Sequence, residues 1–374
     1  MSEAARVLRF PYRWQAPLSQ EDVELSARRF VEMDPQQRSE KEMDLYFSDP
    51  DVLSSICKLL GRAVNADPKL VLERSAAAYR RLSAQGGSCG LFDESDYFLG
   101  EFAILAGGAF RLLGDREEAE TWGHRAEAGF RHTVNPGPQL ARVAYLRLTL
   151  EYDRGRYQNV LDLLPSTLRS FEKFGMKTEA AKAYFLEAMT LKQCSRAQEA
   201  FEKLTSLRGK LEERGGEDAG LLSQVLVGIG AHHGLENRFQ EALETYQQAL
   251  VCLTRTDRRY SVADLKMAIG ETLRNQGALS PAADAFREAV EIFAEVGMTG
   301  NVAYGRIILA ETLIALSRHR EAEWEIQAAL PVIEAQKMVR EGLAAVALLR
   351  ESVSRRHADP NALRELREHL KANS

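Results

Sequence analysis

The sequence predicts an all-α protein built as a solenoid of stacked helical hairpins. Six segments carry a similar short phrase that starts with a turn-forming residue: Gly114, Gly155, Ser195, Asn237, Gly277 and Ser317. One small or β-branched residue in each segment sets the register: Ala119, Val160, Ala200, Ala242, Ala282 and Ala322. Successive register residues are 41, 40, 42, 40 and 40 residues apart. Such a period is typical of repeated helical hairpins, which offer a surface to a partner rather than an enclosed pocket.

Length and composition agree with an extended array. The chain has 374 residues, more than one compact core usually takes, and the regular period favours one array over several unrelated domains. It carries 49 basic and 54 acidic side chains, for a formal net charge of −5. A mildly acidic chain is not suited to bind phosphate backbones non-specifically, so we expect no direct nucleic-acid partner.

Two further features indicate a cytoplasmic location. Cys57, Cys89, Cys194 and Cys252 form no C-x-x-C pair, which favours small buried residues in a reducing compartment. The N-terminal residues lack the apolar core of a signal peptide, and no run of 18 apolar residues occurs. We therefore expect a cytoplasmic protein that does not bind a membrane.

The first 96 residues divide into an arm, a helical region and a loop. Residues 1–17 contain two prolines among aromatic residues and no helical period, which predicts an irregular arm. Ser19 with Asp22 is an acidic variant of the capping box and predicts the first helix of a helical region over residues 18–85. The motifs SDP at 48–50 and ADP at 66–68 predict two more helix starts, because proline is tolerated in the first turn. The glycine-rich stretch 85–96 predicts a loop before the repeats.

Residues 97–335 alternate between helix and turn and repeat a pattern of small and large side chains. Twelve residues before the register residue the side chain is small in five repeats: Gly107, Ala188, Gly230, Gly270 and Ala310, with Leu148 as the exception. Four residues after it the side chain is large in five repeats: Leu164, Leu204, Tyr246, Phe286 and Ile326. Small residues let crossing helices approach closely, and a large neighbour fills the adjacent space.

This pattern resembles the tetratricopeptide repeat (TPR) over about residues 97–335, with the best match in the fourth and fifth repeats. The period of 40–42 residues exceeds the 34 residues usual for that family and is similar to its long-helix members, such as kinesin light chains and the Rap-type peptide-pheromone receptors. The resemblance implies a right-handed superhelical solenoid of about six repeats. Residues 336–374, with two further hydrophilic helices, are then expected to cap the apolar stack.

The histidines and glycines of the chain do not form a recognisable reaction centre. His232 and His233 are adjacent, so on a helix they point about 100° apart and do not chelate one metal as histidines at i and i+4 would. The repeat register instead places His233 against a second helix. No nucleophile elbow, P-loop, dinucleotide-binding glycine set or H-E-x-x-H motif occurs. We expect no enzyme activity, no catalytic residues, no cofactor and no metal site.

The resemblance also implies where a partner binds. In TPR arrays the first helix of each hairpin lines a concave groove, and the aromatic, methionine and basic side chains there suit a peptide. The residues of this chain at such positions, taken as candidate partner-binding residues, are Arg142, Tyr145, Tyr152, Lys182, Phe185, Met189, Lys192, Met267, Arg274 and Asn275. No repeat carries the lysine–asparagine pair of the clamp that binds chaperone C-termini.

We interpret the chain as a non-catalytic cytoplasmic scaffold or regulator that binds a protein or peptide in this groove. Two alternatives stay open: a peptide-responsive signal receptor of the Rap-like kind, and an accessory subunit of a separately encoded enzyme. No residue-level match to the Rap N-terminal region and no DNA-reading helix is evident. The sequence indicates neither the partner's identity nor the oligomeric state.

Overall fold

The computed structural model describes residues 19–32, 47, 49–65, 67–85, 94–215, 218–253, 259–335, 364 and 367–368. The expected arm 1–17, most of the loop 85–96 and most of the region 336–374 lie outside these residues. The chain divides into two compact units, Met1–Ser195 and Arg196–Ser374, and the boundary falls within the third repeat of the sequence pattern. Each unit is described by itself.

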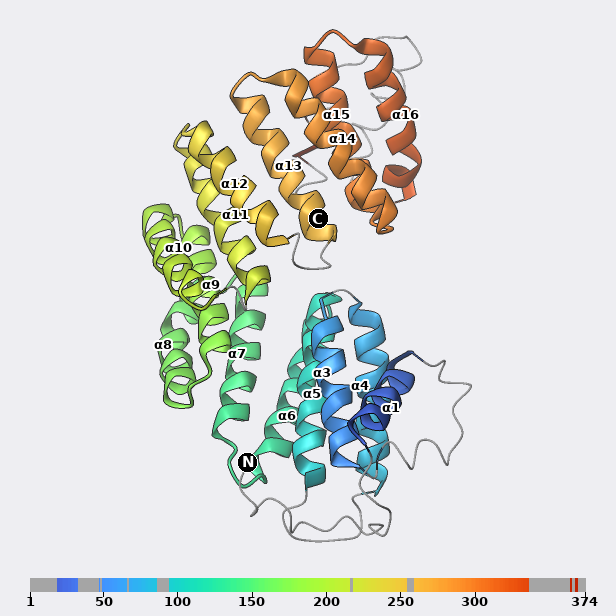
Figure 1. The fold of residues 1–374 in the computed structure, drawn as a ribbon, viewed down its shortest axis with the longest axis vertical. Helices are drawn as coiled ribbons and strands as arrows, with labels where there is room; N and C mark the ends of the chain where they lie inside the picture. The colour runs from blue at the N-terminus through green and yellow to red at the C-terminus, as the bar shows by residue number, and fades with distance from the viewer. Residues whose placement is uncertain are drawn as a thin grey trace. The chain divides into compact units, whose positions relative to one another are not determined.

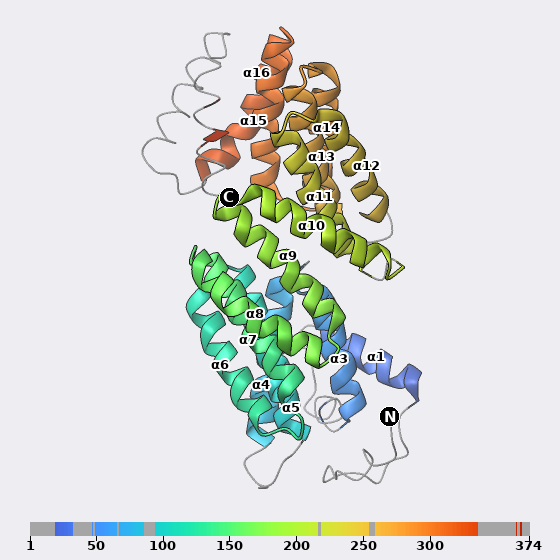
Figure 2. The ribbon, with the colours of Figure 1, turned by 90° about the vertical axis from the view of Figure 1, so that its left-hand side faces the viewer.

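The described residues are helical and form no strand (Figures 1 and 2). The helices of the first unit are α1 (Gln20–Glu32), α3 (Pro50–Ala63), α4 (Pro68–Gln85), α5 (Glu94–Leu112), α6 (Arg116–Arg131), α7 (Gly137–Asp153), α8 (Tyr157–Lys173) and α9 (Lys177–Gln193). Those of the second unit are α10 (Ala197–Glu212), α11 (Ala219–Leu235), α12 (Phe239–Leu253), α13 (Arg259–Asn275), α14 (Leu279–Glu295), α15 (Thr299–Ala315) and α16 (His319–Ala335). In five repeats the two helices belong to the same unit and pack as a hairpin: α5/α6 and α7/α8 in the first unit, and α11/α12, α13/α14 and α15/α16 in the second. None of these helices is long and apolar enough to cross a membrane.

The expected helix starts near the N-terminus are present. Ser19 Oγ accepts a hydrogen bond from the backbone N–H of Asp22 at 3.2 Å and donates one to the Asp22 carboxylate at 2.6 Å. Asp49 caps α3 by accepting from the N–H of Asp51, and Asp67 caps α4 by accepting from that of Leu70. These caps satisfy N–H groups that have no partner inside the helix.

The turn between the two helices of each repeat has one conformation throughout. Its first residue has a positive φ in all six repeats: Gly114, Gly155, Ser195, Asn237, Gly277 and Ser317. The backbone N–H of the following residue, for example Arg318, bonds the carbonyl five positions back, at 2.8 Å in that case. This is the Schellman arrangement, which ends a helix with one left-handed residue. The turn phrase of the sequence is therefore a helix stop.

The small and large positions of the repeat meet at helix crossings. A Cβ added to Gly270 of α13 would lie 2.5 Å from Cε1 of Phe286 on α14, and Gly230 stands in the same relation to Tyr246 of α12. The register residues are buried in every repeat, with 0% of Ala242 and of Ala282 exposed. A real Cβ does not fit at such a distance, so the crossing requires glycine there. The observed architecture is an all-α solenoid of TPR-like hairpins, as the sequence predicts.

We expect Ala242→Leu and Ala282→Leu each to lower the free energy of unfolding by about 1–3 kcal/mol, because the added atoms overpack a closed crossing. Urea unfolding followed by circular dichroism measures the change. Ala294→Leu is the matched control, since Ala294 lies on the same helix as Ala282 and is exposed. If the buried variants unfold at the same urea concentration as the parent, the repeat register is wrong.

Candidate functional site

The candidate partner-binding residues fall in both compact units. Seven lie on α7 and α9 of the first unit: Arg142, Tyr145, Tyr152, Lys182, Phe185, Met189 and Lys192. Three lie on α13 of the second unit: Met267, Arg274 and Asn275. The two groups are therefore two separate sets of residues, and each is described within its own unit.

Two tyrosines join α7 to α9. The hydroxyl of Tyr145 donates a hydrogen bond to the backbone carbonyl of Lys182 at 3.3 Å. The side chain of Tyr152 hydrogen-bonds that of Gln193 near the end of α9, and its ring lies 5.4 Å from that of Tyr157. Burial raises the pKa of Tyr145 to about 12, so its hydroxyl stays protonated and keeps donating at neutral pH. The first helices of two successive repeats are thus linked side by side.

α9 presents one mixed face beside these tyrosines. Lys182, Phe185, Met189 and Lys192 follow each other at spacings of three and four residues, which places them along one side of the helix. The two lysines are exposed, while Phe185 and Met189 are half-buried. We call these four residues, with Tyr145 and Tyr152, the α7–α9 surface. It combines apolar area for contact with positive charge in solvent.

Arg142 has a different setting, because it neutralises a buried acid. Its Nη1 donates a hydrogen bond to Glu101 of α5, whose side chain is 8% exposed. Burial by itself would lower the pKa of Arg142, but the Glu101 carboxylate raises it, so Arg142 stays charged. Arg111 of α5 pairs in the same way with Asp153 of α7 at 2.9 Å. These two pairs link the first helices of the first and second repeats.

In the second unit the three candidates differ in accessibility. Met267 lies in the apolar core beside Phe286 and is 8% exposed, so it offers a partner little surface. Arg274 pairs with Glu311 of α15 at 3.1 Å. Asn275 is exposed at the C-terminal end of α13. The structure does not bring these three residues together into one accessible cluster.

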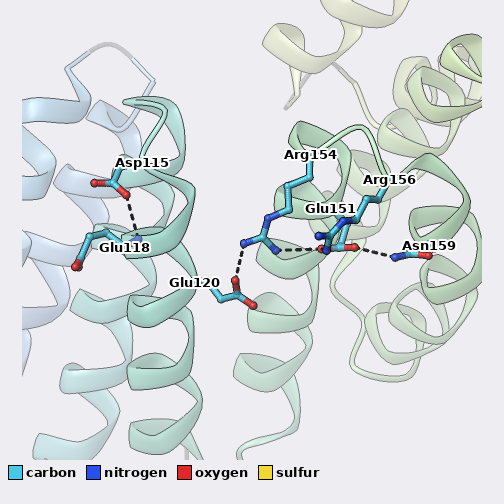
Figure 3. A network of polar contacts seen from close by, with 7 residues as sticks. All are labelled: Asp115, Glu118, Glu120, Glu151, Arg154, Arg156 and Asn159. Carbon is cyan, nitrogen blue, oxygen red and sulfur yellow. Dashed lines mark hydrogen bonds and ion pairs between the residues drawn. The ribbon is translucent and has the colours of Figure 1, made fainter.

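A polar cavity of about 880 Å³ opens at the hairpin turns of the first unit, lined by Gly114, Asp115, Arg116, Glu117, Glu120, Arg154 and Arg156. Figure 3 shows Arg154 reaching from the end of α7 to Glu120 of α6, with its other nitrogen on Glu151. Arg156 and Asn159 also donate hydrogen bonds to the Glu151 carboxylate, at 3.2 and 2.9 Å respectively. Part of the cavity wall, at Glu120, Arg154 and Arg156, is thus made of ion-paired side chains.

These pairs lower the pKa of two carboxylates at the cavity. The hydrogen bond from Arg154 lowers the pKa of Glu120, and that from Asn159, with help from Arg154, lowers the pKa of Glu151. Both carboxylates are therefore ionised at neutral pH, whereas a general acid or base works best with a pKa near the ambient pH. The network holds two successive repeats together.

The histidine pair lies against α10, the second helix of the preceding repeat. The ring of His232 stacks on Phe201 of α10 at 4.3 Å, and that of His233 meets the same ring edge-on at 5.4 Å. Burial lowers the pKa of both imidazoles, which favours their neutral form. Among the described residues no group of three or more His, Cys, Asp or Glu side chains is arranged to hold a metal ion.

The fold is similar to that of several solved structures. A Rap protein complexed with competence and sporulation factor has a TM-score of 0.57 at 13% identity, covering 84% of this chain and 87% of the other. The Rap conjugation gene regulator of plasmid pLS20, in complex with the Phr* peptide, has a TM-score of 0.55 at 12% identity, covering 94% of each chain. A signal transduction ATPase with a tetratricopeptide repeat sensor, from Pyrococcus horikoshii, has a TM-score of 0.58 at 13% identity, covering 95% of this chain and 53% of the other. At such identities the likeness establishes the TPR-like fold and nothing more specific.

Comparisons at the level of sequence add nothing to this. No protein-family model matches the chain, and no curated protein sequence matches it either.

Sequence reasoning missed the acidic partners of the arginines. Glu101 and Arg142 are 41 residues apart, and Arg111 and Asp153 are 42 apart. The first separation equals the period of 41 residues between these two repeats, so Glu101 and Arg142 occupy equivalent positions of successive first helices, and the second separation differs from it by one residue. The sequence did contain a signal for these pairs, namely opposite charges about one repeat period apart.

We expect Arg142→Ala to lower the free energy of unfolding by about 2–3 kcal/mol, because it leaves the buried Glu101 carboxylate unpaired. Urea unfolding measures it. Arg156→Ala is the control: its side chain is 59% exposed, and such surface pairs contribute about 1 kcal/mol or less. The double variant Glu101→Leu/Arg142→Leu should recover part of the loss. Equal stability of Arg142→Ala and Arg156→Ala would contradict the structural role.

Proposed function

We propose that this chain is a non-catalytic cytoplasmic protein that holds a peptide or protein segment on the α7–α9 surface, as a scaffold or regulator. The observation that carries the proposal is the pair of tyrosine hydrogen bonds between α7 and α9. They fix two first helices side by side, so the apolar and basic side chains of α9 are presented on a rigid support. A surface that is ordered before binding loses less entropy when a ligand arrives.

The side chains of this surface define the ligand. Phe185 and Met189 are half-buried apolar contacts four residues apart, and exposed Lys182 and Lys192 flank them. Such a surface fits an extended or helical segment with apolar side chains at its centre and acidic residues at its ends. The apolar contacts supply most of the affinity, and the lysines supply encounter rate and orientation.

A peptide-responsive signal receptor is the second candidate. It is favoured by the fold shared with two structures described as complexes, one with competence and sporulation factor and one with the Phr* peptide. Saturable binding of a short peptide with a change in superhelix pitch would support the receptor. A tight complex with one defined protein would support the scaffold. Capture of partners from native lysate on immobilised protein, followed by mass spectrometry, separates the two.

We expect Tyr152→Ala and Phe185→Ala to weaken binding of the captured partner by more than roughly tenfold, because each removes an aromatic contact from the surface. Isothermal titration calorimetry measures the affinity, and thermal melting shows whether the fold is intact. Tyr184→Ala is the matched control, since Tyr184 is adjacent to Phe185 but donates its hydroxyl to Glu172 of α8. If Phe185→Ala binds as tightly as the parent, the α7–α9 surface is not the site.

Lys182→Glu should weaken binding less than the aromatic variants, mainly through slower association, and the effect should shrink in high salt. Stopped-flow or surface plasmon resonance measurements at two ionic strengths test this. Lys173→Glu makes the same charge change on α8 and should leave association unchanged. A loss that is equal for both lysines would indicate a general effect of net charge and no local contact.

A further inference from the structure

The first helices of the last two repeats share one carboxylate with the C-terminal part of the chain. Glu311 of α15 accepts on Oε2 from Arg274 of α13 at 3.1 Å and from Arg367 at 2.7 Å. The three side chains are largely buried, with 14%, 23% and 19% exposed in that order. A residue 56 positions further along the chain therefore lies on α15 beside α13.

The carboxylate of Glu311 also bonds a residue of the hairpin before the last one. A terminal cap has to cover only the last hairpin, α15/α16, whereas Arg274 belongs to the hairpin before it. Tyr304 of α15 lies near the same charged groups: burial raises the pKa of its hydroxyl, and the charges of Glu271, Arg367, Glu368 and Arg274 also act on it. Arg367 thus lies on α15, at the carboxylate that Arg274 of α13 also bonds. The surface formed by α13 and α15 is made of first helices, as is the one that α7 and α9 form in the other unit.

Arg367 bonds only one of the two carboxylate oxygens of Glu311. Only its Nη1 bonds that carboxylate, while its Nη2 bonds Glu368 at 2.7 Å. The other oxygen of Glu311, Oε1, is buried and has no hydrogen-bond partner in the described part of the chain. An arginine that presents two parallel N–H groups could bond both oxygens and would form the stronger pair. The internal contact is therefore one that another arginine can replace.

We propose that the chain's own segment around Arg367 is a built-in occupant of the α13–α15 surface, and that it keeps arginine-bearing segments of other molecules off Glu311. Its regulatory consequence rests on the proposed function, because a docked segment matters only if partners use surfaces of this kind. Tethering gives the internal arginine a high local concentration, so a weak contact is enough to compete with a free ligand. A partner must displace it before binding there.

The test uses the full-length chain and a fluorescein-labelled peptide with the sequence of residues 360–374. Arg367→Ala removes the internal arginine from Glu311, so fluorescence anisotropy should show the peptide binding about five- to tenfold more tightly than to the parent. Arg364→Ala is the matched control, since Arg364 lies on the same segment and is exposed, and it should bind like the parent. A peptide whose own Arg367 is replaced by alanine should not bind to any of these proteins.

Three outcomes would overturn the proposal. The first is equal peptide affinity of Arg367→Ala and Arg364→Ala. The second is a gain in affinity that persists in Arg367→Ala/Glu311→Gln, which would place the peptide elsewhere. The third is a fall of several degrees in the melting temperature of Arg367→Ala, which would make the segment a structural cap. Hydrogen exchange of residues 364–368 in the same proteins should be faster in Arg367→Ala only, and equal exchange in all of them would also count against docking.

No partner is needed for this test, so its failure is distinguishable from failure of the proposed function. Loss of the α7–α9 site, measured with Phe185→Ala and the natural partner, would leave the docking of Arg367 intact. If the segment around Arg367 proves not to be docked, the proposal for the α7–α9 surface is unaffected.

Discussion

Five of the six repeats have a small residue where the two helices of the hairpin cross, and the stack depends on the close approach at these crossings; Leu148 in the second repeat is the exception. At Gly270 there is no room for a Cβ, because the ring of Phe286 already occupies that space. The turn residue lies five positions before the register residue in all six repeats, so the helix stop and the crossing are at a fixed separation. Because the helix stop and the crossing are both fixed, the outward side of each first helix is determined. The side chains on that side are the ones that can contact a partner or a neighbouring repeat.

This constraint is why the fold was predictable from the sequence. Small and large positions leave a repeating trace, and glycine at Gly114, Gly155 and Gly277 marks a left-handed residue directly. Ser195, Asn237 and Ser317 hold the same conformation without being glycine, and only the shared period identifies them. Helix starts follow from local chemistry that needs no tertiary information: the capping box at Ser19 and the prolines at Pro50 and Pro68 in the first turn.

The candidate site was less predictable, because position in a repeat does not say what a side chain contacts. The period places Arg142 and Lys182 on equivalent kinds of surface, yet Arg142 neutralises buried Glu101 while Lys182 is exposed. Met267 occupies a first-helix position and still lies in the core. The contact of Arg367 with Glu311 joins residues 56 apart, which is no multiple of the period, so no repeat-based argument reaches it.

The way successive first helices are linked decides what is left for binding. Between α5 and α7, and between α13 and α15, arginine–carboxylate pairs make the link and use up the charged side chains. Between α7 and α9 the hydroxyl of Tyr145 bonds a backbone carbonyl and Tyr152 bonds Gln193, so the link uses neither Lys182 nor Lys192. Lys182 and Lys192 therefore stay exposed, with Phe185 and Met189 half-buried between them. Because the Tyr145 bond at this junction ends on a backbone carbonyl, the charged and apolar side chains of α9 remain accessible to a ligand. This is the physical reason to look for the partner at α7 and α9.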